Sequence, residues 1–247
     1  GSIQITALFP HNIPRQSLDT ILKKSFPKNV LTSLTVSTMV NDDWISKWNK
    51  SLQVKVVTER LWLCPSHCEL PKEAPIPLIL DPGFSFGSGE HPSTYLCLKW
   101  LDQHIKPGMQ CIDYGCGSGI LAIAALKLGA SICYAVDTAP QALKASRDNA
   151  EANSIDAKSM PVSLPEDLPK IKADCIMANI VASVLSKLPQ LFKRHLNPEG
   201  KLILSGMLAK QGGALIHHYC DHGFAFLSQK QEGDWLMLAF KLQSTES

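Results

Sequence analysis

The chain has 247 residues, of which 45% are hydrophobic, and a formal net charge of +2. This apolar content can fill the core of one large domain, or of a main domain with a small satellite. The sequence has no apolar run of the roughly 18 residues that a membrane span needs. Its lysines and arginines are scattered, which gives no evident nucleic-acid footprint. We therefore expect a globular protein that binds neither membranes nor nucleic acid directly.

Cysteine usage indicates the redox environment. Residues 64–68, "CPSHC", have a metal-like spacing, but no second Cys/His pair follows at zinc-site spacing, so we predict no metal. Because other cysteines lie in apolar patterns typical of reduced, buried thiols, we predict a reducing compartment, the cytoplasm. Five cysteines lie within such apolar helix or strand patterns: Cys97, Cys111, Cys116, Cys133 and Cys175.

The front of the chain predicts a small separate piece. Residues 3–40 read as strand, helix and strand, which is a thin core for an independent domain. The segment "NDDWISKWNKSL" follows, with a helix start signal and tryptophans at helical spacing. We therefore expect a partial α+β domain over residues 1–40 and a linker helix and crossing over residues 41–60.

Residues 61–247 predict one α/β domain. The strand "IPLIL" leads into the loop "DPGFSFGSGE" and a helix over 92–104. Strands and helices then alternate, and because the strands are almost wholly apolar, they predict a doubly wound parallel sheet closed by an antiparallel hairpin. In order these are "QCIDY", helix 118–128, "SICYAV", helix 139–153, a strand near 157–162, "DCIMAN", helix 180–195, "KLILSG", helix 210–221, "FAFLSQ" and "WLMLAFKL".

A glycine loop follows the strand "QCIDY". In such sheets ligands bind beyond the carboxyl ends of the strands, so Gly115, Gly117 and Gly119 are candidate ligand contacts. Their spacing departs from the dinucleotide pattern G-x-G-x-x-G, since position 120 is Ile. Asp113, just before the loop, repels a pyrophosphate but suits a cationic ligand. S-adenosylmethionine carries both a sulfonium and an ammonium group.

Three further polar residues lie at strand ends or in the glycine loop. Asp137 ends the next strand and can accept hydrogen bonds from both hydroxyls of a ribose. Asn179, in "DCIMANIV", can offer one acceptor and two donors to an incoming group. Ser118 is expected to cap the following helix rather than to bind a ligand.

The sequence resembles the bacterial ribosomal protein L11 methyltransferases over nearly all of residues 41–247. The resemblance implies a seven-stranded, Rossmann-like, S-adenosylmethionine-dependent methyltransferase domain and an N-terminal domain that docks the ribosomal protein. It also implies methylation of lysine ε-amines and of the N-terminal α-amine. The blocks that carry the resemblance are "DDWISKW", "ERLWLCPSH", "DPGFSFGSGEHPSTYLCLKWLD", "IDYGCGSGILAIAALKLGA", "QALKASRDNAEAN", "ADCIMANI" and "LILSGML".

The resemblance also implies site residues. Asn179 is expected to be catalytic as well as a cofactor contact, because its carboxamide can accept the amine's hydrogens and aim the lone pair. His91 could act as a base, but a histidine next to Pro92 in a glycine loop could instead pack or cap a helix. The residues expected to bind the cofactor are Thr94, Gly115, Asp137 and Asn179, with Asp113, Gly117 and Gly119 in the glycine loop and Phe84, Phe86 and His91 as wall and lid.

Some features depart from the family, and other functions stay open. Ser88 and Glu90 stand where the family commonly has Thr, and the region before residue 41 is shorter than the family's docking domain. We expect a monomer that acts on the stalk-base ribosomal protein. The alternatives are a methyltransferase for another protein or a small molecule, a nicotinamide-dependent oxidoreductase, and a catalytically silent binding module.

Overall fold

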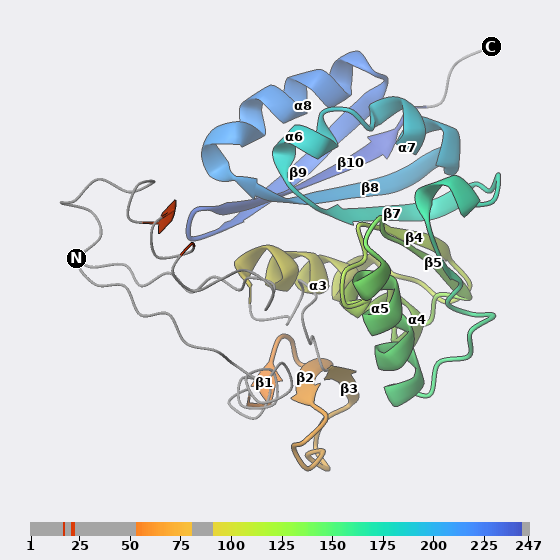
Figure 1. Cartoon of the computed structure of the whole chain (residues 1–247). Coiled ribbons are helices and arrows are strands. Elements are labelled where there is room, and N and C mark those ends of the chain that lie inside the picture. The colour runs from red at the N-terminus through yellow and green to blue at the C-terminus, as the bar shows by residue number, and fades with distance from the viewer. Residues whose placement is uncertain (1–16, 18–20, 23–52, 81–90, 244–247) are drawn as a thin grey trace. The chain divides into compact units, whose positions relative to one another are not determined.

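A computed structural model describes residues 17, 21–22, 53–80 and 91–243 (Figure 1). The chain divides into two compact units, Gly1–Lys47 and Trp48–Ser247. In the first unit, residues 17 and 21–22 are helical, and they lie in the stretch where a helix was predicted. The predicted linker helix after residue 40 lies outside the described residues, so the domain boundaries stay predictions.

The second unit contains a seven-stranded sheet with the order β6-β5-β4-β7-β8-β10-β9. The first five strands in that order are parallel, and β10 is antiparallel to both of its neighbours. The prediction of a doubly wound α/β sheet closed by a hairpin is confirmed. The strands are β4 (Gln110–Tyr114), β5 (Ile132–Val136), β6 (Val162–Ser163), β7 (Ala173–Asn179), β8 (Leu196–Leu208), β9 (Phe224–Glu232) and β10 (Trp235–Leu242).

Helices cover both faces of this sheet (Figure 1). On one face lie α3 (Pro92–His104), α4 (Ile120–Lys127) and α5 (Pro140–Ala152), and on the other lie α6 (Ala182–Leu185), α7 (Pro189–His195) and α8 (Gly212–Asp221). Short 3-10 turns span Pro165–Asp167 and Ala209–Gln211. The core therefore has two layers, one on each face of the sheet. Within the described part of the chain, no helix has the length and apolar character of a membrane span.

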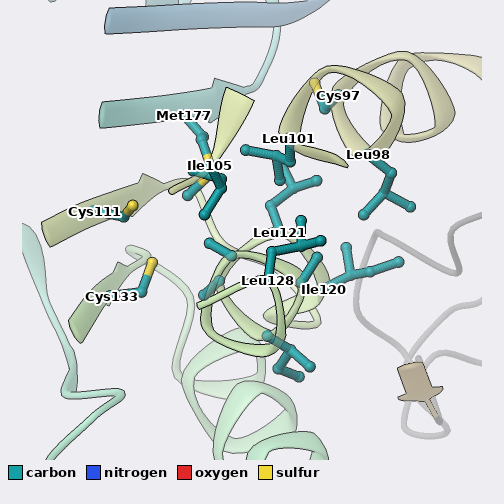
Figure 2. Packing of buried hydrophobic residues seen from close by; sticks show 14 of the residues in the cluster. Cys97, Leu98, Leu101, Ile105, Cys111, Ile120, Leu121, Leu128, Cys133 and Met177 are labelled. Carbon is teal, nitrogen blue, oxygen red and sulfur yellow. The ribbon is translucent and has the colours of Figure 1, made fainter. Parts of the chain in front are cut away.

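The predicted buried cysteines lie in the layer under α3 and α4 (Figure 2). Cys111 on β4 is in register with Cys133 on β5 and with Cys175 on β7. Burial raises the pKa of Cys97, on α3, to about 12, so its thiol stays protonated. All five cysteines predicted to be buried are buried and free, which confirms that prediction.

Four predicted elements differ from the structure. The helix expected over 180–195 divides into α6 and α7, because Pro189 has no backbone N–H to continue a helix and begins a new one instead. The strand expected near 157–162 is only β6, Val162–Ser163, while β8 begins earlier than expected, at Leu196. The helix expected over 210–221 starts as a 3-10 turn before α8.

A second, three-stranded sheet precedes α3. It consists of β1 (Lys55–Val56), β2 (Leu61–Pro65) and β3 (Ile76–Leu80), so its first strand lies inside the predicted crossing. Asn153, directly after α5, forms hydrogen bonds with both the backbone N–H and the backbone C=O of one residue of β3. Its Oδ1 accepts from Ile79 N at 2.9 Å, and its Nδ2 donates to Ile79 O at 2.6 Å. This pair attaches the small sheet to the helix layer of the large one.

Candidate active site

The predicted site residues meet at one edge of the large sheet. Parallel strands β4, β5, β7 and β8 all end at this edge, which is where doubly wound sheets bind ligands. Because β10 is antiparallel to β8, it begins at the same edge, where Trp235 pairs with Leu208. Asp137, the glycine loop, Asn179 and Trp235 therefore follow one another across the strands, in the order β5, β4, β7 and β10.

The glycine loop has a backbone that other residues adopt only with strain. Gly115, Gly117 and Gly119 have φ angles of 81°, 54° and 80°, in the left-handed region that favours glycine. A Cβ on Gly119 would lie 3.2 Å from the backbone of Ser146. Gly119 itself is the N-cap of α4, without a side-chain cap bond, so the prediction that Ser118 caps this helix is wrong. The tight backbone leaves room only for glycine at the helix start.

Asp137 holds the glycine loop against the next helix. Its Oδ2 accepts from Gly117 N and its Oδ1 from Ala139 N, both at 3.0 Å. A carboxylate has about four acceptor positions, so these two bonds leave capacity for the hydroxyls of a ribose. Asp137 can therefore order the loop and bind a ligand with the same two oxygens.

Asp113 is a buried carboxyl group behind the loop. It is 1% exposed, its Oδ2 accepts from Ala122 N at 3.1 Å, and its Oδ1 has no hydrogen-bond partner among the described residues. Burial raises the pKa of Asp113 to about 7, with the hydrogen bond from Ala122 opposing this shift and nearby Asp137 adding to it. A bound cation would favour the charged form, so this carboxyl group fits a cationic ligand.

Asn179 and Thr94 form a pair across 85 residues of sequence. Asn179 Nδ2 donates to Thr94 Oγ1 at 3.1 Å, and Thr94 is buried in the first turn of α3. The bond fixes the amide so that Asn179 Oδ1, a buried atom with no partner in the described part of the chain, remains to accept a hydrogen bond. Such an unpartnered acceptor at the carboxyl end of β7 suits an incoming N–H group.

His91 caps α3 and contacts an aromatic ring. Its Nδ1 accepts from Ser93 N at 3.3 Å and lies 2.7 Å from Ser93 Oγ. Its ring centroid is 4.3 Å from that of Trp235, in an edge-to-face arrangement. Burial lowers the pKa of His91, so the ring is neutral near pH 7. The other two predicted wall residues, Phe84 and Phe86, lie outside the described residues.

Sequence reasoning missed the polar face of α5 that supports the loop. Ser146 Oγ donates to Gly117 O at 3.0 Å, and Asn149 Nδ2 donates to Ser118 O at 2.9 Å. Their spacing, three residues apart on one helix face, was the available signal. Trp235 was also missed, although the first residue of an antiparallel last strand must lie at the site edge.

The large sheet has seven strands and is closed by an antiparallel strand. At one edge of it lie a glycine loop, a carboxylate with spare acceptor capacity and an amide oxygen without a partner among the described residues. Together these features define the class of methyltransferases. A solved structure shares the fold. A methyltransferase from Pyrococcus furiosus superposes with a TM-score of 0.52 at 19% identity, covering 62% of this chain and 82% of that chain, which shows the fold.

The particular family follows from closer relatives. The family model described as Ribosomal protein L11 methyltransferase (PrmA) matches residues 1–243. The ribosomal protein L11 methyltransferase of Tolumonas auensis is 38% identical over 239 residues, which are 96% of this chain and 80% of the relative. The crystal structure of ribosomal protein L11 methylase from Lactobacillus delbrueckii subsp. bulgaricus has a TM-score of 0.70 at 29% identity, covering 78% of this chain and 100% of that chain. The chain belongs to the ribosomal protein L11 methyltransferase family.

Proposed function

We propose that this chain transfers methyl groups from S-adenosylmethionine to lysine ε-amines, or to the N-terminal α-amine, of ribosomal protein L11. The observation that carries the proposal is the buried Oδ1 of Asn179 beside the glycine loop, which has no partner among the described residues, in a chain of this family. An N–H of the substrate amine can donate the hydrogen bond that Asn179 Oδ1 lacks. The function also requires a cofactor, which the same edge of the sheet can hold.

The residues present fit S-adenosylmethionine. Asp137 has acceptor capacity for the ribose, and the unpartnered Oδ1 of Asp113 suits a positive charge. When bound, the cofactor supplies a methyl group activated by a cationic sulfonium. Thr94, Gly115, Gly117, Gly119 and Asn179 complete the proposed cofactor contacts, with Phe84, Phe86 and His91 as the wall and lid.

Asn179 acts by positioning the acceptor amine. A free lysine has a pKa near 10.4, so the site must favour the neutral amine, and desolvation near positive charge shifts the lysine pKa downward. Asn179 Oδ1 accepts one N–H of this amine, which aims the lone pair, while Thr94 prevents the amide from rotating. Once methylated, the nitrogen is an ammonium group, and it releases one proton to solvent. Neutral His91 adds no positive charge that would repel the substrate.

The proposal assigns substrate docking to the front of the chain. We propose that residues 1–40 dock the ribosomal protein, that 41–60 link the domains, and that 61–247 form the catalytic domain of a cytoplasmic monomer without direct nucleic-acid contacts. The cofactor-site residues all lie beyond residue 80. Deletion of residues 1–40 should therefore leave S-adenosylmethionine affinity within about threefold, under 1 kcal/mol, while methylation of L11 collapses. Methylation that survives the deletion would place recognition in the catalytic domain.

Mass spectrometry tests the main proposal. L11 incubated with the enzyme and S-adenosylmethionine should gain mass in steps of one methyl group, and peptide mapping should place the groups on amines. Calorimetry with S-adenosylhomocysteine and NAD separates this function from an oxidoreductase, since only the former should bind. An L11 of unchanged mass, in the presence of an enzyme that binds the cofactor, would contradict the proposal.

A further inference from the structure

Trp235 forms an aromatic pair with His91 at one end of the site. The two ring centroids lie 4.3 Å apart with an interplanar angle of 73°. Trp235 is only half-buried, although it begins a strand whose next five residues are buried. A large, partly exposed aromatic side chain held by a neutral partner ring is available to contact a ligand.

Strand β8, which lies beside Asn179, also fixes the position of Trp235. Asn179 is in register with Ser205 on β8, and Ser205 Oγ donates to Leu236 O on β10 at 2.9 Å. Ala209 N donates to Asp234 O at 2.8 Å, which ties the start of β10 to the end of β8. The tryptophan is therefore placed by the backbone of the catalytic edge.

The sheet order places Trp235 on the side of Asn179 that faces away from the glycine loop. Asp137 follows β5 and the glycine loop follows β4, so both proposed cofactor contacts lie on one side of β7. Strands β8 and β10 lie on the other side. At about 4.8 Å between strands, β10 is about 10 Å from β7. His91 is the N-cap of α3, three residues before Thr94, and its ring contacts that of Trp235.

We propose that Trp235 is a specificity-determining residue for the acceptor, packing against the aliphatic stem of the substrate lysine and attracting its ammonium group as it enters, before that group loses a proton and reaches Asn179 as a neutral amine. This inference rests on the proposed function. Lysine and its methylated forms are cations with apolar stems, and the face of tryptophan attracts cations more strongly than that of tyrosine or phenylalanine. His91 holds the Trp235 ring, and because His91 is neutral it does not itself act as the cation at that ring. The aromatic pair therefore recognises the acceptor, and the β4–β5 side recognises the cofactor.

The variants Trp235→Leu and Trp235→Phe separate aromatic recognition of the lysine from simple packing. We expect Trp235→Leu to raise KM for L11 about tenfold and to weaken L11 binding, measured with S-adenosylhomocysteine present, by a similar factor. We expect kcat to change less than threefold and cofactor affinity less than twofold. Trp235→Phe keeps a π face and should recover KM to within about threefold of the unmodified chain. Trp62→Phe, on β2 of the small sheet, is the matched control and should change none of these values.

The outcomes decide between the two proposals. If the unmodified chain does not methylate L11, the proposed function and this inference both fail. If it does, and Trp235→Leu leaves KM and L11 binding unchanged, only the inference fails. Equal defects in the Leu and Phe variants would assign Trp235 to packing, and a loss of cofactor affinity comparable to the rise in KM would assign it to the cofactor site. Either of these results overturns the inference.

Discussion

The two halves of the site edge are built by different means. The β4–β5 half is formed by backbone groups, with three glycines in left-handed conformations and Asp137 bound to two backbone N–H groups. In the half beyond it, side chains make the links, through Asn179 to Thr94 and through His91 to Trp235. The left-handed backbone, which only glycine adopts easily, fixes the β4–β5 half, which we propose binds the cofactor and call the cofactor half. We propose that the other half binds the acceptor and call it the acceptor half, and substitutions there should alter substrate handling while the fold is kept.

The largest expected effect comes from breaking the acceptor half at Asn179. Asn179→Ala should slow methyl transfer about 100-fold, the scale of losing one preorganised hydrogen-bonding group, with cofactor affinity within about threefold. Single-turnover rates and calorimetry measure the two quantities. Thr94→Ser is the control, since it keeps the hydroxyl that binds the amide. Equal losses of rate and affinity would make Asn179 a plain cofactor contact.

Breaking the cofactor half at Asp137 should reverse that pattern. Asp137→Ala removes an acceptor of charge-assisted hydrogen bonds and releases Gly117 N, so cofactor affinity should fall by about 1.5–3 kcal/mol. The rate at saturating cofactor should change less. Asp148→Ala, at an exposed position on α5, provides a matched loss of one carboxylate. An unaltered affinity in folded Asp137→Ala protein would remove this residue from the site.

A smaller effect is expected from the buried carboxyl of Asp113. Its pKa, raised from 3.8 to about 7, means that the protonated form stabilises the fold and that this stability is lost as pH rises toward and through 7. Binding of a cationic cofactor favours the ionised form, so affinity should increase between pH 6 and pH 8 by at most about tenfold. Both trends should flatten in Asp113→Asn.

Melting temperatures from pH 4 to pH 8 and calorimetric titrations from pH 6 to pH 8 check the Asp113 prediction. The neutral product S-adenosylhomocysteine lacks the sulfonium charge and serves as the control ligand. Its affinity should depend less on pH than that of S-adenosylmethionine. A pH dependence that persists unchanged in Asp113→Asn would assign the titration to another group.

Much of the fold could be predicted from local patterns. Apolar runs predict strands, and apolar residues at helical spacing predict helices. These predictions hold where the buried residues follow the repeat of the element, as in β4, α4 and β5. The topology rule then places strand ends at one edge, so Gly115, Asp137 and Asn179 could be selected as site candidates without coordinates.

Only the tertiary structure decided which distant residues meet. The sequence placed Asn179 at a strand end by itself, but its bond to Thr94 joins residues 85 apart, and the attachment of Asn153 to Ile79 spans 74. Trp235 looked like an ordinary start of a last strand until the insertion of β10 between β8 and β9 brought it to the site edge. Local periodicity encodes which face of an element is buried. It does not encode the partner on that face, because partners are selected by packing among residues that the sequence keeps far apart.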